Sequence, residues 1–170
     1  MARSGRADNA IDIIRWYQHN CGVSKATEVP FETTIFVRDH CLCLHLQRAA
    51  RALARRFDDA LRPIGLTSGQ YSMMMSLNRP EPPTIGSVAS LLAMDRTTLT
   101  AALKPLQRRG LVTVVVDAND RRSRRPKLTR AGRALLARAV PVWQRTHAEI
   151  DRLLPRGGAG RLRRDLRAMT

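Results

Sequence analysis

The chain has 170 residues, 44% of them hydrophobic, and its 30 lysines and arginines outnumber its 14 aspartates and glutamates, which gives a formal net charge of +16. This length suits one well-buried domain with short extensions and excludes two large domains. The hydrophobic content excludes a wholly disordered chain, and the positive charge predicts a polyanionic partner: nucleic acid, an anionic membrane surface or an acidic protein.

The apolar segments support neither membrane insertion nor secretion. Apolar runs such as Val112 to Val116 are far shorter than the roughly 20 residues that cross a bilayer. The N-terminal segment has neither a continuous apolar stretch nor a small-residue cleavage site. The three cysteines, Cys21, Cys41 and Cys43, lack the spacing of a disulfide framework, which suits a reducing compartment. We therefore expect a cytoplasmic protein.

The first part of the chain, residues 1–38, is a nearly neutral arm with five basic and four acidic residues. Asp8 or Asn9 is placed to cap a short helix whose apolar face needs a partner surface. From Asp39 to Leu61, apolar residues recur at spacings of three and four. This pattern predicts a long amphipathic helix that ends before Pro63.

Three shorter helices are predicted next. Thr67 or Ser68 caps the first, Thr84 caps the second, and Asp95 caps the third, which closes at Gly110. Two short helices joined by a tight turn form a helix-turn-helix, and its second helix is available to enter a DNA groove.

After Gly110 the hydrophobic period changes from helical to that of a strand. A β-branched run at 112–116, a turn signal at 117–120 and the basic sequence RRSRR at 121–125 precede a short return strand around Pro126–Leu128. This pattern predicts a basic β-hairpin, or wing. A final long helix begins at Thr129, so the expected architecture is mainly α with one small hairpin.

Two prolines and a glycine cluster interrupt the helical pattern. Pro105 and Pro141 lie inside predicted helices, where each removes a backbone hydrogen bond and predicts a bend. The glycines at 157, 158 and 160 predict a linker before a last basic helix.

The positive charge is concentrated in one part of the chain. Between Asp95 and Arg133, eleven basic residues face three acidic ones, a net charge of +8, whereas the N-terminal arm contributes +1. Because these charges lie on a helix and a hairpin that are shaped for a duplex, they indicate DNA as the polyanion.

In this order, the elements and their residues resemble the MarR (multiple antibiotic resistance regulator) family of winged helix-turn-helix transcription factors. The resemblance spans roughly residues 40 to 155. Its pieces are Leu66-Thr67-x-x-Gln70, Val88-Ala89 with Leu92, Asp95-Arg96-Thr97-Thr98-Leu99-Thr100, Leu106-x-x-x-Gly110-Leu111-Val112, and Asp117-x-Asn119-Asp120-Arg121-Arg122 followed by Leu128-Thr129-x-x-Gly132.

The resemblance implies a homodimer with two DNA-binding lobes. We expect residues 65–128 to form the winged helix-turn-helix lobe, residues 39–64 and 129–170 to form a helical dimerisation region, and residues 1–38 to pack on the dimer partner. The expected function is repression of neighbouring genes by binding a pseudopalindromic operator, with release by a small-molecule ligand or a stress signal.

The candidate DNA contacts lie on the third short helix and on the wing. The first turn of that helix reaches base edges in the major groove, and its candidates are Arg96, Thr97, Thr98 and Thr100. Farther along it, Lys104 and Arg108 are placed for phosphate contacts. The wing candidates are Arg121, Arg122, Arg124 and Arg125, with Arg122 favoured for a narrow minor groove. Asp120 repels phosphate, so we expect it to orient a neighbouring arginine, a role that the resemblance also implies.

The sequence suggests two kinds of signal that would control DNA binding. A small molecule held between the dimerisation helices and the DNA-binding lobe would contact His45, Arg48, Tyr71 and Met75, although these residues fit a core or surface role equally well.

Thiol oxidation is the second kind of signal. The sequence around Cys43 resembles the organic-hydroperoxide-sensing branch of the family. Gln47 and Phe57, however, stand where that branch has tyrosines that support a reactive thiolate. A buried structural cysteine is therefore the favoured interpretation of Cys43.

Other function classes lack their sequence signals. The chain has no phosphate-binding GxxxxGK[ST], HExxH or GxSxG motif, and its cysteines and histidines have no zinc-ligand spacing. We expect no enzymatic activity, cofactor or metal. A DNA-binding architectural protein without sequence preference remains an alternative.

Overall fold

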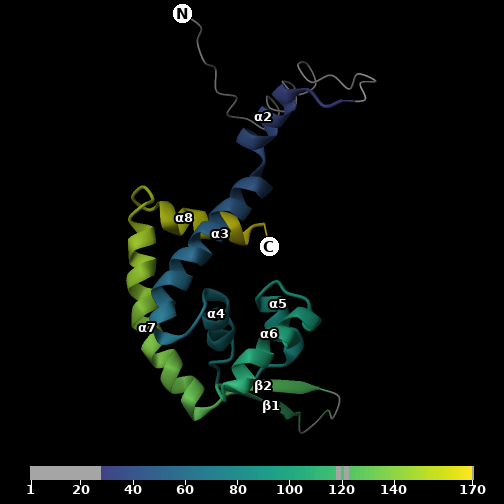
Figure 1. Cartoon of the computed structure of the whole chain (residues 1–170), viewed down its shortest axis with the longest axis vertical. Helices are drawn as coiled ribbons and strands as arrows, with labels where there is room; N and C mark the ends of the chain where they lie inside the picture. The colour runs from purple at the N-terminus through teal and green to yellow at the C-terminus, as the bar shows by residue number, and fades with distance from the viewer. Residues whose placement is uncertain (1–27, 118–119, 121–122, 170) are drawn as a thin grey trace, which may run out of the picture. The chain divides into compact units, whose positions relative to one another are not determined.

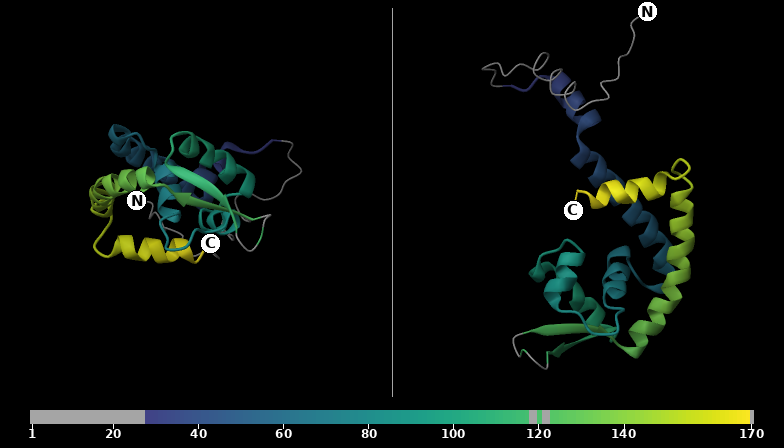
Figure 2. Two further views of the ribbon diagram at one scale, coloured as in Figure 1. Left: turned by 90° about the horizontal axis from the view of Figure 1, so that it is seen from below. Right: turned by 180° about the vertical axis from the view of Figure 1, so that it is seen from behind.

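The computed structural model describes residues 28–117, 120 and 123–169. Its helices and hairpin are drawn in Figure 1, with further views in Figure 2. The chain divides into two compact units, Met1–Ala50 and Arg51–Thr170. The expected short helix near Asp8 lies outside the described residues.

The first unit contains helix α2 (Phe31–His40) and the first half of helix α3 (Leu42–Leu61). The sequence pattern predicted one helix from Asp39 onward, whereas a separate helix precedes it and the backbone is extended at Cys41. Locally, the rings of Phe36 and His40 stack with their centroids 4.3 Å apart. No residue from 28 to 50 is buried in the described chain.

The second unit begins with the other half of α3 and a 3-10 turn, η1 (Arg62–Ile64). As predicted, the helix ends before Pro63. Three helices follow: α4 (Ser68–Ser76), α5 (Ile85–Leu91) and α6 (Arg96–Arg108).

Helix starts in the second unit carry side-chain caps where the sequence predicted them. Thr67 and Gln70 form a reciprocal capping box at α4, and Thr84 accepts a hydrogen bond from the Ser87 N–H at α5. These bonds satisfy backbone donors that a helix start leaves free. The predicted cap at Asp95 is also present, and α7, which was expected to begin at Thr129, is capped by the Thr129 side chain.

The hairpin pairs β1 (Val112–Val116) with β2 (Arg124–Leu128) in antiparallel register, from Val112 opposite Leu128 to Val116 opposite Arg124. β2 begins earlier than the expected return strand, so the last two arginines of RRSRR belong to a strand. Both views in Figure 2 show the hairpin beside the helices of this unit, and β1 contacts α6.

Helix α7 (Arg130–Asp151) follows β2 directly, and α8 (Gly158–Arg167) ends the described chain. The Thr129 hydroxyl donates to the carbonyl oxygen of Gly110, 2.7 Å away, and Gly132 lies against the Leu111 carbonyl. These contacts fix the start of α7 on the hairpin. Pro105 and Pro141 lie inside helices that continue beyond them, and the bends expected there stay predictions.

The core of the second unit is formed by apolar side chains from all of its layers. Its fully buried members include Leu61, Met74, Val88, Leu99 and Leu103. These residues come from α3, α4, α5 and α6, so one core fixes the helix-turn-helix and the end of α3 together.

Candidate DNA-binding surface

Helix α6 begins at a fixed cap. One carboxylate oxygen of Asp95 accepts the backbone N–H of Thr98 at 2.7 Å, and the other accepts its hydroxyl at 2.5 Å. Hydrogen bonds from the Thr98 side chain and backbone lower the pKa of Asp95, because they stabilise its charged form. The cap therefore stabilises the first turn of α6.

The four predicted base-contacting residues, Arg96, Thr97, Thr98 and Thr100, are all exposed. Two of their hydroxyl groups already donate hydrogen bonds within the helix: Thr98 to Asp95, and Thr100 to the carbonyl oxygen of Arg96 at 2.7 Å. Their oxygens still accept, and their methyl groups are free for apolar contact. This chemistry suits a base amino group or a thymine methyl better than a phosphate, which only accepts hydrogen bonds.

The outer face of α6 is opposite its buried leucines, Leu99, Leu103 and Leu106. The exposed residues at helical spacing on this face are Thr97, Ala101, Lys104 and Arg108. A shallow hollow of about 410 Å³ lies here, and Ala101, Lys104 and Arg108 help to line it. Ala101 was absent from the predicted contacts, although the helical spacing from Thr97 could have indicated it.

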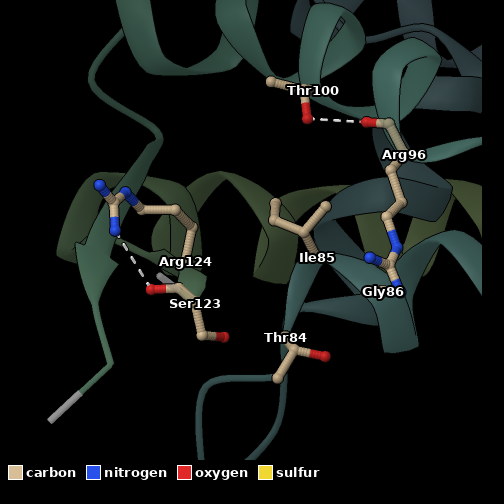
Figure 3. A pocket seen from close by; sticks show the side chains of 7 residues that line it. All are labelled: Thr84, Ile85, Gly86, Arg96, Thr100, Ser123 and Arg124. Atoms are coloured by element: carbon tan, nitrogen blue, oxygen red, sulfur yellow. Dashed lines mark hydrogen bonds between the residues drawn. The ribbon is translucent and has the colours of Figure 1, made fainter. Parts of the chain in front are cut away.

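A second hollow, of about 400 Å³, lies between the starts of α5, α6 and β2 (Figure 3). Arg96 and Arg124 stand on opposite sides of it in Figure 3. Its lining residues are Thr84, Ile85, Gly86, Arg96, Thr100, Ser123 and Arg124. None of them is acidic, so the hollow suits an anion.

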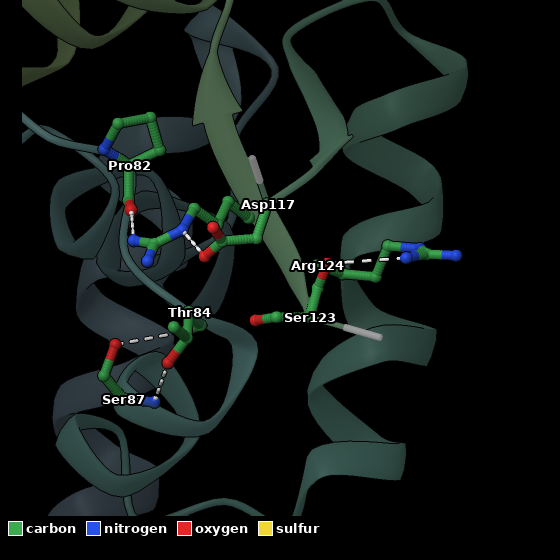
Figure 4. A network of polar contacts seen from close by, with 7 residues as sticks. Pro82, Thr84, Ser87, Asp117, Ser123 and Arg124 are labelled. Carbon is green, nitrogen blue, oxygen red and sulfur yellow. Dashed lines mark hydrogen bonds and ion pairs between the residues drawn. The ribbon is translucent and has the colours of Figure 1, made fainter. Parts of the chain in front are cut away.

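The base of the wing is fixed by an ion pair within the hairpin and by a hydrogen bond from the hairpin to the loop before α5, both drawn in Figure 4. Arg125 pairs with Asp117, which is only 7% exposed, and also donates to the carbonyl oxygen of Pro82 at 2.7 Å. Arg125 was predicted to contact DNA, but its guanidinium is committed to these internal partners. Its position in the inner part of β2, rather than at the tip, accounts for this arrangement.

The rest of the predicted wing site is only partly within the described chain. Arg121 and Arg122 lie outside the described residues. Asp120 is exposed, and its backbone carbonyl accepts the Ser123 N–H at 2.9 Å. Arg124 is exposed at the start of β2 and lines the second hollow, so it is the described wing arginine best placed for DNA.

Two of the predicted ligand contacts, Tyr71 and Met75, line one pocket of about 430 Å³ with Trp143. The rings of Tyr71 and Trp143 stack 6.1 Å apart, and burial raises the pKa of the Tyr71 hydroxyl. Sequence reasoning left Trp143 out of this set, although its helical spacing from Leu136 and Ala139 indicated the inner face of α7.

The other two predicted ligand contacts, His45 and Arg48, belong to the first unit. The His45 ring contacts the Asp39 carbonyl at 3.1 Å, and Arg48 is exposed. A cleft that unites all four residues therefore stays a prediction.

Cys43 is exposed, so the favoured interpretation of a buried structural cysteine is wrong for the described chain. Its position explains the difference, because no side chain of residues 28–50 enters a core. The side-chain amide of Gln47 donates to the Cys43 sulfur at 3.2 Å. Gln47 stands where the resemblance implies a tyrosine, and its amide takes the place of that tyrosine beside the sulfur.

Two features are absent from the described part of the chain. Within it, no group of three or more His, Cys, Asp or Glu side chains is placed to hold a metal ion. None of its helices is both long and apolar enough to span a bilayer.

Comparisons with known proteins give a consistent result. Residues 66–123, which include the helix-turn-helix and the wing as far as the residue before β2, match the model of the MarR family. The organic hydroperoxide resistance transcriptional regulator of Bacillus subtilis is 30% identical over 101 residues, which cover 59% of this chain and 69% of that protein. The transcriptional activatory protein BadR of Rhodopseudomonas palustris is 34% identical over 95 residues, which cover 54% of each chain. The match therefore spans just over half the length of BadR.

A solved structure with the same fold contains DNA. The transcriptional regulator MosR of Mycobacterium tuberculosis, crystallised in complex with DNA, superimposes with a TM-score of 0.70 at 39% sequence identity. The similarity covers 76% of this chain and 93% of MosR. It confirms the expected mainly helical fold with a hairpin wing.

Proposed function

This chain belongs to the MarR family of transcriptional regulators, and on that premise we propose that it is a homodimeric, sequence-specific repressor of neighbouring genes. The observation that carries the proposal is the fixed, exposed first turn of α6 beside a hollow that Arg96 and Arg124 flank. A helix of this kind fits the major groove, and the wing fits the adjacent minor groove. Its place of action is the cytoplasm.

The proposed contacts divide into base-edge and phosphate contacts. Thr97, Thr98 and Thr100 present methyl groups and acceptor oxygens at the start of α6, which suits base edges. Lys104 and Arg108 lie farther along the same exposed face and suit phosphates. We assign Arg121 and Arg122 to the minor groove, with Asp120 orienting one of them.

The proposed dimer rests on exposed apolar side chains in the helices that flank the DNA-binding lobe. On α3, Leu42, Leu46 and Leu53 are 69%, 38% and 39% exposed, and on α8, Leu162 is 43% exposed. Exposed leucines at helical spacing form an apolar face that is typical of a protein interface, and a second copy of this chain would bury it. Residues 39–64 and 129–170 are thus proposed for dimerisation, residues 65–128 for DNA binding, and residues 1–38 for packing on the partner.

The proposed signal is a small molecule bound in the pocket of Tyr71, Met75 and Trp143. This pocket is lined by α4, α7 and the end of α5, so an occupant contacts both a flanking helix and the helix-turn-helix. A ligand causes the protein to release the operator only if it binds the DNA-incompetent state more tightly than the DNA-competent state. The redox alternative through Cys43 is less favoured, because Gln47 replaces the supporting tyrosine.

Fluorescence anisotropy with two labelled 30-base-pair duplexes tests the proposed DNA binding. One is the duplex that the protein enriches from a randomised library, and the other is its scrambled sequence. We expect at least a roughly 1,000-fold preference for the enriched duplex at about 150 mM salt. A ratio near one would instead support an architectural protein without sequence preference, and a reporter whose transcription falls after deletion of the gene would contradict repression.

A further inference from the structure

The position of the hollow between α5, α6 and β2 determines which part of a bound duplex would face it. A recognition helix in the major groove and a wing in the neighbouring minor groove lie on either side of one sugar-phosphate strand, because that strand separates the two grooves. The hollow has Arg96 and Thr100 of α6 on one side, and on the other Arg124 of β2 with the preceding Ser123 (Figure 3). In the proposed complex, the strand between the grooves therefore crosses this hollow.

Gly86 allows the Arg96 side chain to lie along the wall of the hollow. A Cβ atom at position 86 would be 3.2 Å from one terminal guanidinium nitrogen of Arg96, 3.4 Å from its Nε and 3.5 Å from its Cζ. Three guanidinium atoms at nearly equal distances indicate that the planar group lies across the glycine. A side chain at position 86 would compete for that space.

From this arrangement we propose that the hollow seats one phosphodiester group of the DNA backbone, that Arg96 and Arg124 bind it, and that Gly86 is a positioning residue for Arg96. The inference rests on the proposed function and adds a phosphate contact to it. Arg96 was predicted to contact base edges, but here it binds phosphate and carries no sequence information directly.

The chemistry of the lining suits a phosphodiester. A guanidinium is always charged and donates two parallel hydrogen bonds to phosphate oxygens. Thr84 accepts the Ser87 N–H through its hydroxyl oxygen, so its hydroxyl proton is available to a phosphate at the same wall. The Thr100 hydroxyl binds the Arg96 carbonyl and thus supports the backbone from which the guanidinium extends.

Salt dependence separates a phosphate contact from a base contact. The enriched and scrambled duplexes are titrated with wild-type protein and with Arg96→Ala at several salt concentrations. We expect Arg96→Ala to weaken binding of both duplexes about tenfold. The slope of log affinity against log salt should fall by about one for each half-site. The ratio of the two affinities should stay within about twofold, since no base contact is lost.

Gly86→Leu tests the positioning role. Leucine is a better helix former than glycine, so the melting temperature should stay equal or rise, whereas affinity for both duplexes should fall about as far as in Arg96→Ala. In the Arg96→Ala background, the added leucine should cost less than about a further twofold, because the two changes act on one interaction. Arg138→Ala, which removes the same charge from an exposed position on α7, should leave the salt slope unchanged.

The outcomes distinguish this inference from the proposed function. If Arg96→Ala lowers the affinity ratio about tenfold or more, Arg96 reads a base and the phosphate assignment is wrong. An unchanged salt slope, or additive losses in the double variant, also overturns it. If wild-type protein shows no preference between the duplexes, the proposed function fails, yet the change in slope still decides whether Arg96 binds phosphate.

Discussion

Arg125 of β2 pairs with Asp117 at the end of β1 and also binds the carbonyl oxygen of Pro82, so one side chain joins the two strands of the wing to the loop before α5. Asp117 is nearly buried, whereas the Arg125 side chain is 35% exposed. A buried carboxylate needs its partner, because an uncompensated charge is costly there. The two strands of the wing are thereby joined to the loop before α5.

Replacing Arg125 is expected to loosen this connection. Arg125→Ala leaves Asp117 without its guanidinium partner and should lower the free energy of unfolding by about 1–3 kcal/mol. Arg125→Lys keeps the charge but loses the fork that reaches both partners, so it should recover only part of this loss. Urea denaturation of the purified proteins measures both values.

Arg124→Ala is the matched control for the wing, since it removes the neighbouring arginine without touching this ion pair. It should weaken DNA binding and lower the free energy of unfolding by less than Arg125→Ala does, because Arg124 is exposed whereas the carboxylate that Arg125 pairs with is nearly buried. Equal stability of the Arg124 and Arg125 variants would show that the pair with Asp117 does not anchor the wing.

The cap of α6 predicts a pH dependence. The folded-state pKa of Asp95 lies below its ordinary value, so the carboxylate stabilises the folded protein above that ordinary value, and this contribution is lost as the pH falls through the folded-state pKa. The difference in melting temperature between wild type and Asp95→Ala should have its largest value near pH 6 and should become smaller below about pH 4.

Asp95→Asn is the control for this titration, because asparagine accepts the Thr98 N–H but carries no titrating carboxyl. Its melting temperature should exceed that of Asp95→Ala, with a difference that changes little between these pH values. A difference between wild type and Asp95→Ala that stays constant down to about pH 3 would contradict the cap assignment.

Gly132 of α7 lies against the backbone of Leu111, just before β1. A Cβ atom there would lie 2.0 Å from the Leu111 carbonyl oxygen, which belongs to the backbone and cannot turn aside. Gly132→Ala should therefore lower the free energy of unfolding by at least about 2 kcal/mol. Gly69→Ala has no atom within 4 Å of its new methyl group and should stabilise α4 by about 0.5–1 kcal/mol. Denaturation curves that give both variants the same stability would rule out this close contact.

The sequence predicted those parts of the fold that depend on neighbouring residues. The caps at Thr67, Thr84 and Asp95 were found because a hydroxyl or carboxylate at a helix start satisfies local backbone donors. The β-branched run at 112–116 likewise indicated a strand, and the structure confirms it.

What the sequence did not predict depends on contacts between distant residues. One partner of Arg125 is a carbonyl oxygen 43 positions away in the sequence. Composition could therefore indicate that Arg125 is basic, but not that its guanidinium already binds other parts of the chain. The position of Arg96 over Gly86 also depends on how α5 packs on α6. Cys43 is exposed because residues 28–50 form no core of their own. The amphipathic pattern of α3 gives no sign of this.

The exposed leucines of α3 give a test of the proposed dimer. Leu46→Glu places a charge where a partner subunit would bury an apolar side chain, and a buried unpaired charge is costly. We expect the mass measured by light scattering to shift from dimer to monomer at micromolar concentration, with loss of tight operator binding, because one lobe then binds alone. Gln107→Glu, at an exposed position on α6, should alter DNA binding but leave the mass unchanged. A Leu46→Glu protein that remains dimeric would show that this face of α3 is not the interface.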